Sequence, residues 1–164
     1  MKLGLATMVM LASVGSATAA DVYDSVYVTD PAVCERAGGD EEIGQILFEL
    51  QASAVAPRVG IRMGELVCKL NDLRMNSGTW GTDEVNATAR CDGPYLAFLD
   101  QVAITSDSGN INLTWGDQEG TPPAMVEIIS MKHGDSTDAE RDKDSYAGVY
   151  TLCDTLTAAD FSAE

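Results

Sequence analysis

Hydrophobic and polar residues alternate along much of the chain with a period of two, which is typical of half-buried β-strands. The clearest cases are the segments 65–70 and 84–91, ELVCKL and EVNATARC. Their apolar positions fall on one face of each predicted strand: Leu66, Cys68 and Leu70 in the first, and Val85, Ala87, Ala89 and Cys91 in the second. Each segment therefore predicts a strand with one buried face.

The segment 46–56, ILFELQASAVA, shows the same alternation, with one face formed by Phe48, Leu50, Ala52 and Ala54. A helix is the alternative here, because Leu47, Phe48 and Leu50 lie among residues with high helix propensity. We interpret the segment as a strand.

Further strands are predicted at 94–106, 110–117, 125–132 and 146–153. The first two flank the turn residues Ser108-Gly109-Asn110, which favour positive φ, so this pair is predicted to form a hairpin. In the last, YAGVYTLC, one face carries Gly148, Tyr150 and Leu152 and the other Val149, Thr151 and Cys153.

One short helix is predicted near the start of the domain, in the segment 28–39, VTDPAVCERAGG. Asp30 can cap it, Pro31 suits a first helical position, and Gly38-Gly39 ends it. Cys34 therefore lies on a helix. Together with six to eight short strands separated by turn residues, this predicts an all-β fold, either a small antiparallel barrel or a sandwich.

The first nineteen residues have the composition of a signal peptide. Lys2 gives a positive start, residues 3–14 are almost all apolar, and Ala17 and Ala19 form the small-residue pair that precedes a cleavage site. We expect cleavage after Ala19 or Ala20, which leaves residues 20–164 as one domain. The apolar run is shorter than the roughly 20 residues that a membrane helix needs, and no later segment is long and apolar enough, so no membrane attachment is expected after cleavage.

All four cysteines lie in the mature part, and an even number in an exported chain predicts two disulfides. Successive cysteines are separated by 33, 22 and 61 residues, and there is one histidine, so zinc binding is not expected. Four cysteines allow three pairings. We prefer Cys68 with Cys91, because both lie on inward faces of successive strands, and this leaves Cys34 with Cys153. The second bridge would close a loop of about 120 residues.

The motifs DPAVC, GELVC, VNATARC and GVYTLC, which end at the four cysteines, resemble those of an uncharacterised family of small exported four-cysteine proteins of alphaproteobacteria. The resemblance covers the mature chain and implies an all-β, disulfide-linked fold and a periplasmic or secreted location. It implies no activity. The chain is also similar in size, export and disulfide use to the small periplasmic lysozyme-inhibitor barrels, which present a serine-glycine loop, here compared with Ser108-Gly109.

The formal charge of the whole chain is −16. Lys2 is the one charged residue among the first nineteen, so the mature chain carries −17. Such a surface repels nucleic acid and anionic lipid, and its partner, if it has one, is expected to be a basic protein or a cation. We favour the interpretation of a soluble acidic surface with no such partner, because the acids are spread along the chain rather than gathered in one run, and a monomer is favoured.

The most polar segment is 133–144, HGDSTDAERDKD, which holds His133, the one histidine of the chain, and five acidic residues. It departs from a calcium-binding EF-hand loop, because it has no central glycine and because Arg141 and Lys143 lie between its acids. We interpret it as a solvated connection between strands. No catalytic residue, cofactor site or metal site is predicted, since one histidine and four oxidised cysteines leave no nucleophile with its base.

These features predict an exported binding or interaction protein of the cell envelope rather than an enzyme. One alternative is an inhibitor of an extracytoplasmic hydrolase such as lysozyme. A small hydrolase that uses a pair of carboxylates is the second alternative, because the 26 acidic residues offer many pairs.

Overall fold

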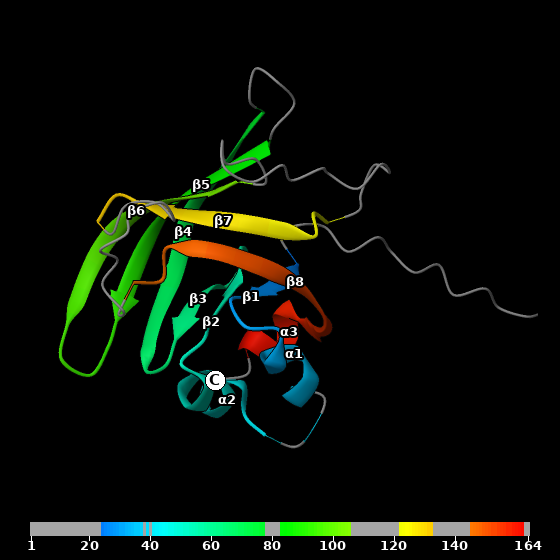
Figure 1. Ribbon diagram of the computed structural model, residues 1–164. Coiled ribbons are helices and arrows are strands. Elements are labelled where there is room, and N and C mark those ends of the chain that lie inside the picture. The colour runs from blue at the N-terminus through cyan, green and yellow to red at the C-terminus, as the bar shows by residue number, and fades with distance from the viewer. Residues whose placement is uncertain are drawn as a thin grey trace, which may run out of the picture.

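The computed structural model of the protein describes residues 24–37, 39, 41–77, 83–105, 122–132 and 145–162. Eight antiparallel strands form a closed barrel in which each strand pairs with its neighbours in the sequence and the last pairs with the first (Figure 1). The prediction of an all-β fold is confirmed, in the form of a barrel. The elements in chain order are β1 (Ser25–Val28), α1 (Ala32–Arg36), α2 (Ile43–Leu50), β2 (Ser53–Ala56), β3 (Gly60–Met63), β4 (Leu66–Ser77), β5 (Asp83–Asp92), β6 (Ala97–Thr105), β7 (Met125–Ser130), β8 (Gly148–Thr157) and α3 (Ala158–Ser162).

The barrel interior is a packed hydrophobic core. Its fully or largely buried members are Tyr27, Val55, Ile61, Cys68, Leu70, Val85, Ala87, Ala89, Cys91, Val102, Ile104, Val126, Ile128, Tyr146 and Tyr150. An eight-stranded barrel is just wide enough for side chains to fill. The alternation predicted for 84–91 is confirmed, because all four of its apolar residues belong to this core.

The three helices cover one side of the barrel, over β1, β3 and β8 (Figure 1). A second hydrophobic cluster lies beneath them: Val26, Val28, Val33, Ile43, Ile46, Leu47, Ala52, Ala54, Ala56, Cys153, Leu156 and Phe161. β1 is therefore buried on both faces, with Tyr27 in the barrel core and Val26 and Val28 under the helices. A strand buried on both faces shows no alternation of polarity, and β1 was not predicted.

The strand predicted over 46–56 is wrong in its first half. Residues Ile43–Leu50 form α2, and only Ser53–Ala56 form a strand. Ile43, Ile46 and Leu47 are spaced to share one helical face and are buried, whereas Phe48, which the strand interpretation placed inward, is 63 % exposed. The helix ends where Gln51 adopts a left-handed conformation with φ of 51°.

The helix α1 spans Ala32–Arg36 and carries Cys34. The carboxylate of Asp30 accepts a hydrogen bond from the Ala32 N–H at 2.9 Å, which satisfies one of the donors at the start of the helix. Because β1 precedes α1, the described part of the chain begins with a strand rather than with the helix. The predicted hairpin around Ser108-Gly109 and the strand 110–117 lie outside the described residues.

Both preferred disulfides are confirmed. Cys68 and Cys91 lie directly opposite each other on β4 and β5 and are joined inside the barrel. Cys34 and Cys153 join α1 to β8 across a sequence separation of 119 residues. Disulfides of this kind are usual in oxidising compartments outside the cytosol. In the ranges that the structure describes, no helix has the length and apolar character needed to cross a membrane.

Gly60, at the start of β3, allows β3 and β4 to approach closely. A Cβ atom at this position would lie 2.1 Å from the carbonyl oxygen of Cys68, a backbone atom that cannot turn aside. We expect Gly60→Ala to lower the free energy of unfolding by about 2 to 3 kcal/mol, the cost of forcing an added methyl group into a packed region. Urea unfolding followed by far-ultraviolet circular dichroism measures this change.

Gly39→Ala is the matched control, since the nearest atom to its added Cβ, the Arg36 carbonyl oxygen, lies 3.4 Å away. It is expected to change the free energy of unfolding by less than about 0.5 kcal/mol, as most surface substitutions do. Equal stability of the two variants would contradict the close approach of β3 and β4 at Gly60.

Candidate functional site

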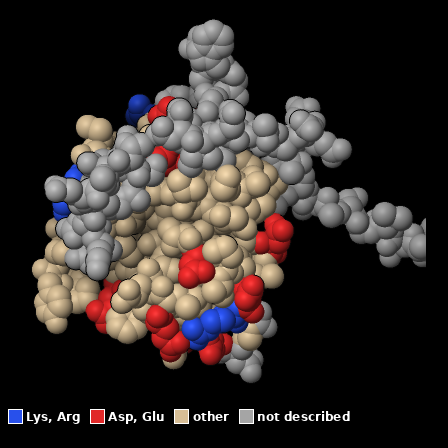
Figure 2. Space-filling view, viewed as in Figure 1, with Lys and Arg blue, Asp and Glu red and all other residues tan. Residues whose placement is uncertain are grey.

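Acidic side chains gather on the side of the barrel that carries the helices. Figure 2 shows a group of Asp and Glu side chains around a basic group over α1 and α2. Four exposed glutamates lie on or beside these two helices: Glu35, Glu41, Glu42 and Glu49. The surface over α1 and α2 therefore carries a group of carboxylates that come from separate parts of the sequence.

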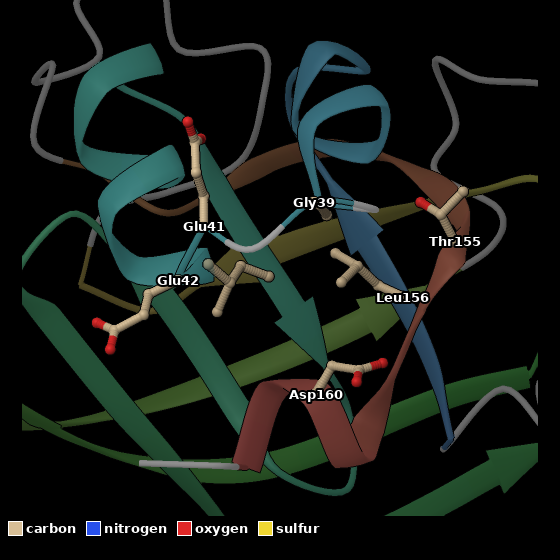
Figure 3. Close-up of a pocket in the computed structure, with 8 residues that line it drawn as sticks. Gly39, Glu41, Glu42, Thr155, Leu156 and Asp160 are labelled. Atoms are coloured by element: carbon tan, nitrogen blue, oxygen red, sulfur yellow. The ribbon is translucent and has the colours of Figure 1, made fainter.

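A cleft of about 370 Å³ opens on this face, between the segment that joins α1 to α2 and the end of β8 with α3 (Figure 3). Its lining residues are Ala37, Gly39, Glu41, Glu42, Ile43, Thr155, Leu156 and Asp160. The volume is in the range of clefts that take small ligands or single side chains. No lysine or arginine is among the described residues that line it.

The floor of the cleft is apolar and its rim is acidic. Ile43 and Leu156, 9 % and 7 % exposed, belong to the hydrophobic cluster beneath the helices. The carboxylates of Glu41 and Glu42 point in different directions, and neither points towards Asp160 (Figure 3). Because the three carboxylates do not converge, they do not form a cage for a metal ion, and the described residues contain no group of three or more metal-binding side chains.

Two of the three rim carboxylates, those of Glu41 and Asp160, already have partners within the protein. Arg36 donates to Glu41 at 2.6 Å and to Glu49 at 2.7 Å, and its hydrogen bond lowers the pKa of Glu49, as does the bond from Gln45. Asp160 accepts bonds from the hydroxyl and the backbone N–H of Thr157, and these lower the pKa of Asp160. Glu49 and Asp160 are therefore ionised at neutral pH.

Glu42 differs from its neighbours at the rim. Its side chain is exposed and forms no ion pair or hydrogen bond with another described residue. It stands at the residue before α2, in an extended conformation with φ of −68° and ψ of 135°. Its carboxylate is therefore the rim charge that is available to a ligand without breaking an existing contact.

This combination of an apolar floor and an anionic rim suits a long basic side chain. The hydrocarbon stem of a lysine or arginine packs on apolar surface while its charged end stays near carboxylates and water. The sequence did not single out Glu41, Glu42 or Asp160, because the acids at 41–42 and 160 are brought together only when α3 follows β8 back to the helices. The signal that could have found them is the Glu41-Glu42 pair directly before the buried Ile43.

A second polar cluster lies inside the barrel and is centred on Asp100 of β6. Its carboxylate accepts hydrogen bonds from the Tyr146 hydroxyl, from the Ser130 hydroxyl at 2.5 Å and from the backbone N–H groups of Gln101 and Lys132 at 2.8 and 3.1 Å. Burial raises the pKa of Tyr146, and the bond to Asp100 raises it further. Tyr146 therefore remains protonated and acts as the donor.

The Asp100 cluster is closed to solvent, since Asp100, Ser130 and Tyr146 are 5 %, 2 % and 1 % exposed. The cluster joins β6, the end of β7 and the residues before β8, and the Tyr150 hydroxyl extends it by donating to the Tyr146 carbonyl oxygen at 2.5 Å. A carboxylate that is surrounded by donors and sealed from substrate is suited to holding strands together rather than to catalysis.

The structure describes only some of the other residues that the sequence analysis considered. His133, the acidic segment 133–144 and the Ser108-Gly109 loop lie outside the described residues. Every cysteine in the chain is oxidised, so there is no thiol nucleophile. The hydrolase-inhibitor alternative, which depends on Ser108-Gly109, therefore stays a prediction.

Comparisons of the chain with protein-family models, with curated proteins and with solved structures find no match. The resemblance to exported four-cysteine proteins also stays a prediction, and function has to be argued from the geometry of the molecule.

Proposed function

We propose that this protein is an exported binding protein of the cell envelope, periplasmic or secreted, that uses its helix-side cleft to hold a basic side chain of a partner protein. The first nineteen residues, with the composition of a signal peptide, and the two disulfides support export. The proposal includes no catalytic step.

The observation that carries the proposal is the composition of the cleft. Three carboxylates at its rim surround the apolar side chains of Ile43 and Leu156, and no basic residue among those described lines it. A basic partner would gain attraction at long range from the net charge of −16 and at short range from the rim. An anionic or purely apolar ligand gains neither.

The proposal is tested with a short lysine oligomer as the probe, titrated into the oxidised protein by isothermal calorimetry at about 0.1 M salt. We expect Glu42→Gln to weaken binding by roughly 3- to 10-fold, because it removes the one rim charge that no described residue engages. The substitution breaks no described hydrogen bond, so the fold should be unchanged.

Glu35→Gln is the matched control. Glu35 is an exposed residue of α1 outside the cleft, and the substitution changes the net charge by the same amount. Binding equal to that of the unmodified protein is expected. If both variants weaken binding equally, the oligomer is held by overall charge alone and the cleft is not the site.

A further inference from the structure

The outer wall of the barrel at β5, β6 and the end of β7 carries exposed apolar side chains. Tyr95, Leu96, Leu99 and Met131 are 98 %, 53 %, 70 % and 82 % exposed. We call these four residues the wall patch. The main contacts of the helices with the barrel are to β1, β3 and β8, and Figure 1 shows the helices over that part of the barrel.

The four residues of the wall patch are close together at one end of these strands. Tyr95 and Leu96 lie in the turn between β5 and β6, and Leu99 lies in β6 and points outward. Met131 follows β7 and donates its backbone N–H to the carbonyl of Gln101, two residues from Leu99. Side chains at such diagonal positions on adjacent strands can touch. A group of exposed apolar residues at neighbouring positions marks a contact surface more often than scattered apolar residues do.

Two basic residues, Lys69 and Arg90, adjoin the wall patch. Their position opposite each other does not stabilise the monomer. Lys69 and Arg90 are paired directly across β4 and β5, and Arg90 is paired with Leu99 across β5 and β6. Both basic residues are exposed. Like charges placed directly opposite each other destabilise a sheet, and among the described residues Asp92 approaches Arg90 at 3.7 Å. Carboxylates of a partner would neutralise the pair.

The same chain presents the complementary surface on α2. Phe48 is 63 % exposed and is followed by Glu49, while Glu41 and Glu42 precede the helix. We call Phe48 with these three glutamates the helix face. Phe48 is its apolar centre, and of its three carboxylates Glu41 and Glu49 bind Arg36 while Glu42 has no described partner. The wall patch has an apolar area beside the basic pair Lys69 and Arg90. The two surfaces are different, so they match head to tail rather than each with itself.

We propose that the wall patch, with Lys69 and Arg90, docks on the helix face of a second copy of this chain. The inference rests in part on the proposed function, since Glu41 and Glu42 belong to both the helix face and the cleft rim, and it names Lys69 and Arg90 of a second copy as the basic groups that approach this rim. Four apolar residues form a small contact, so the association is weak and concentration-dependent. A head-to-tail contact that does not close on itself lets chains of copies grow.

The test is sedimentation of the oxidised mature protein between about 10 μM and about 1 mM, a range that covers weak association. We expect the weight-average mass to rise with concentration, and to rise less at about 0.5 M than at about 0.1 M salt because ions screen the charge pairs. Leu99→Glu and Phe48→Glu should each abolish the rise. Arg74→Glu, an exposed change on β4 outside the patch, should leave it.

Mixing the two defective variants gives a sharper result. The Leu99→Glu copy keeps its helix face and the Phe48→Glu copy keeps its wall patch, so an equal mixture can form one contact per pair. Its mass should rise towards two copies and no further. Growth beyond two copies in the mixture, a rise that persists in either variant alone, or a constant monomer mass of the unmodified protein under all conditions would overturn the proposal.

The two proposals fail separately. If the unmodified protein stays monomeric while Glu42→Gln weakens binding of the lysine oligomer, self-association is wrong and the cleft keeps its proposed role. If the mass rises as expected but Glu35→Gln and Glu42→Gln weaken binding of the lysine oligomer equally, the cleft proposal is wrong. The contact between copies is then still supported by the effects of Phe48→Glu and Leu99→Glu.

Discussion

Replacing Cys34 and Cys153 together by alanine is expected to lower the free energy of unfolding by about 5 kcal/mol in the chain-entropy model of disulfide stabilisation. The bridge spans 119 residues, so its loss releases most of the chain in the unfolded state. It also removes the covalent link between α1 and β8 beside the hydrophobic cluster under the helices. Urea unfolding of the variant and of the oxidised protein measures the difference.

The second disulfide is the comparison for this prediction. Cys68 and Cys91 are 23 residues apart, which gives about 3 to 4 kcal/mol in the same model, to which the void left by two buried sulfur atoms adds. If removing Cys34 and Cys153 lowers the free energy of unfolding by less than about 2 kcal/mol, the bridge does not restrict the unfolded chain as this model assumes.

Replacing Asp100 by alanine is expected to cost about 3 to 5 kcal/mol, because it deprives two buried hydroxyls and a part-buried N–H of an acceptor. The hydroxyls of Ser130 and Tyr146 and the Lys132 N–H all bond to this carboxylate. A buried donor that loses its acceptor costs roughly 1 to 3 kcal/mol. Thermal and urea unfolding report the loss, and it should appear as a shift of the midpoint with little change in the urea dependence.

Two further variants measure how much the charge of Asp100 and the single bond from Tyr146 each contribute to the stability of this cluster. Asp100→Asn keeps the size of the side chain and an oxygen that can accept from the backbone, so a loss of only about 1 to 2 kcal/mol is expected. Tyr146→Phe removes a single donor, and about 1 to 2 kcal/mol is expected there too. If Asp100→Ala is no worse than Tyr146→Phe, the carboxylate does not organise the cluster.

Where one face of a strand is buried, the sequence alone predicts the structure well. The segment 84–91 places small apolar residues on one face and polar residues on the other, and they form β5 with that face inward. The same alternation on β4 brings Cys68 opposite Cys91, so both disulfides followed from it. Period-two patterning carries this information because consecutive side chains of a strand point to opposite faces.

The helix layer could not be predicted by the same rule. β1 is buried on both faces, so it shows no alternation, and α2 was taken for a strand because its apolar residues near Phe48 fit both periods. Ile43, three residues before Ile46 and four before Leu47, is the evidence for a helix that an interpretation beginning at residue 46 leaves out. A helix that packs on a barrel wall is specified by tertiary contacts as much as by propensity.

The polar sites were predictable only in part. Asp100 falls on the same face as Val102 and Ile104 in the alternation of β6, and a charged residue at an inward position is itself a sign of a buried cluster. Its partners, Ser130 and Tyr146, are 30 and 46 residues away in the sequence, and only the closure of the barrel brings them to it. The cleft depends on the helix layer in the same way.

The pairing of β1 with β8 also determines when the fold can form during synthesis. Ser25 pairs with Thr157, so the barrel closes only after the chain has been made as far as β8. Until then the sheet has two open edges, and Cys34 has no Cys153 to join. Contacts between distant parts of a sequence form late and slowly. A nascent chain of this protein therefore stays in an open state until its last strand is complete, and a chain truncated before β8 never reaches the closed barrel.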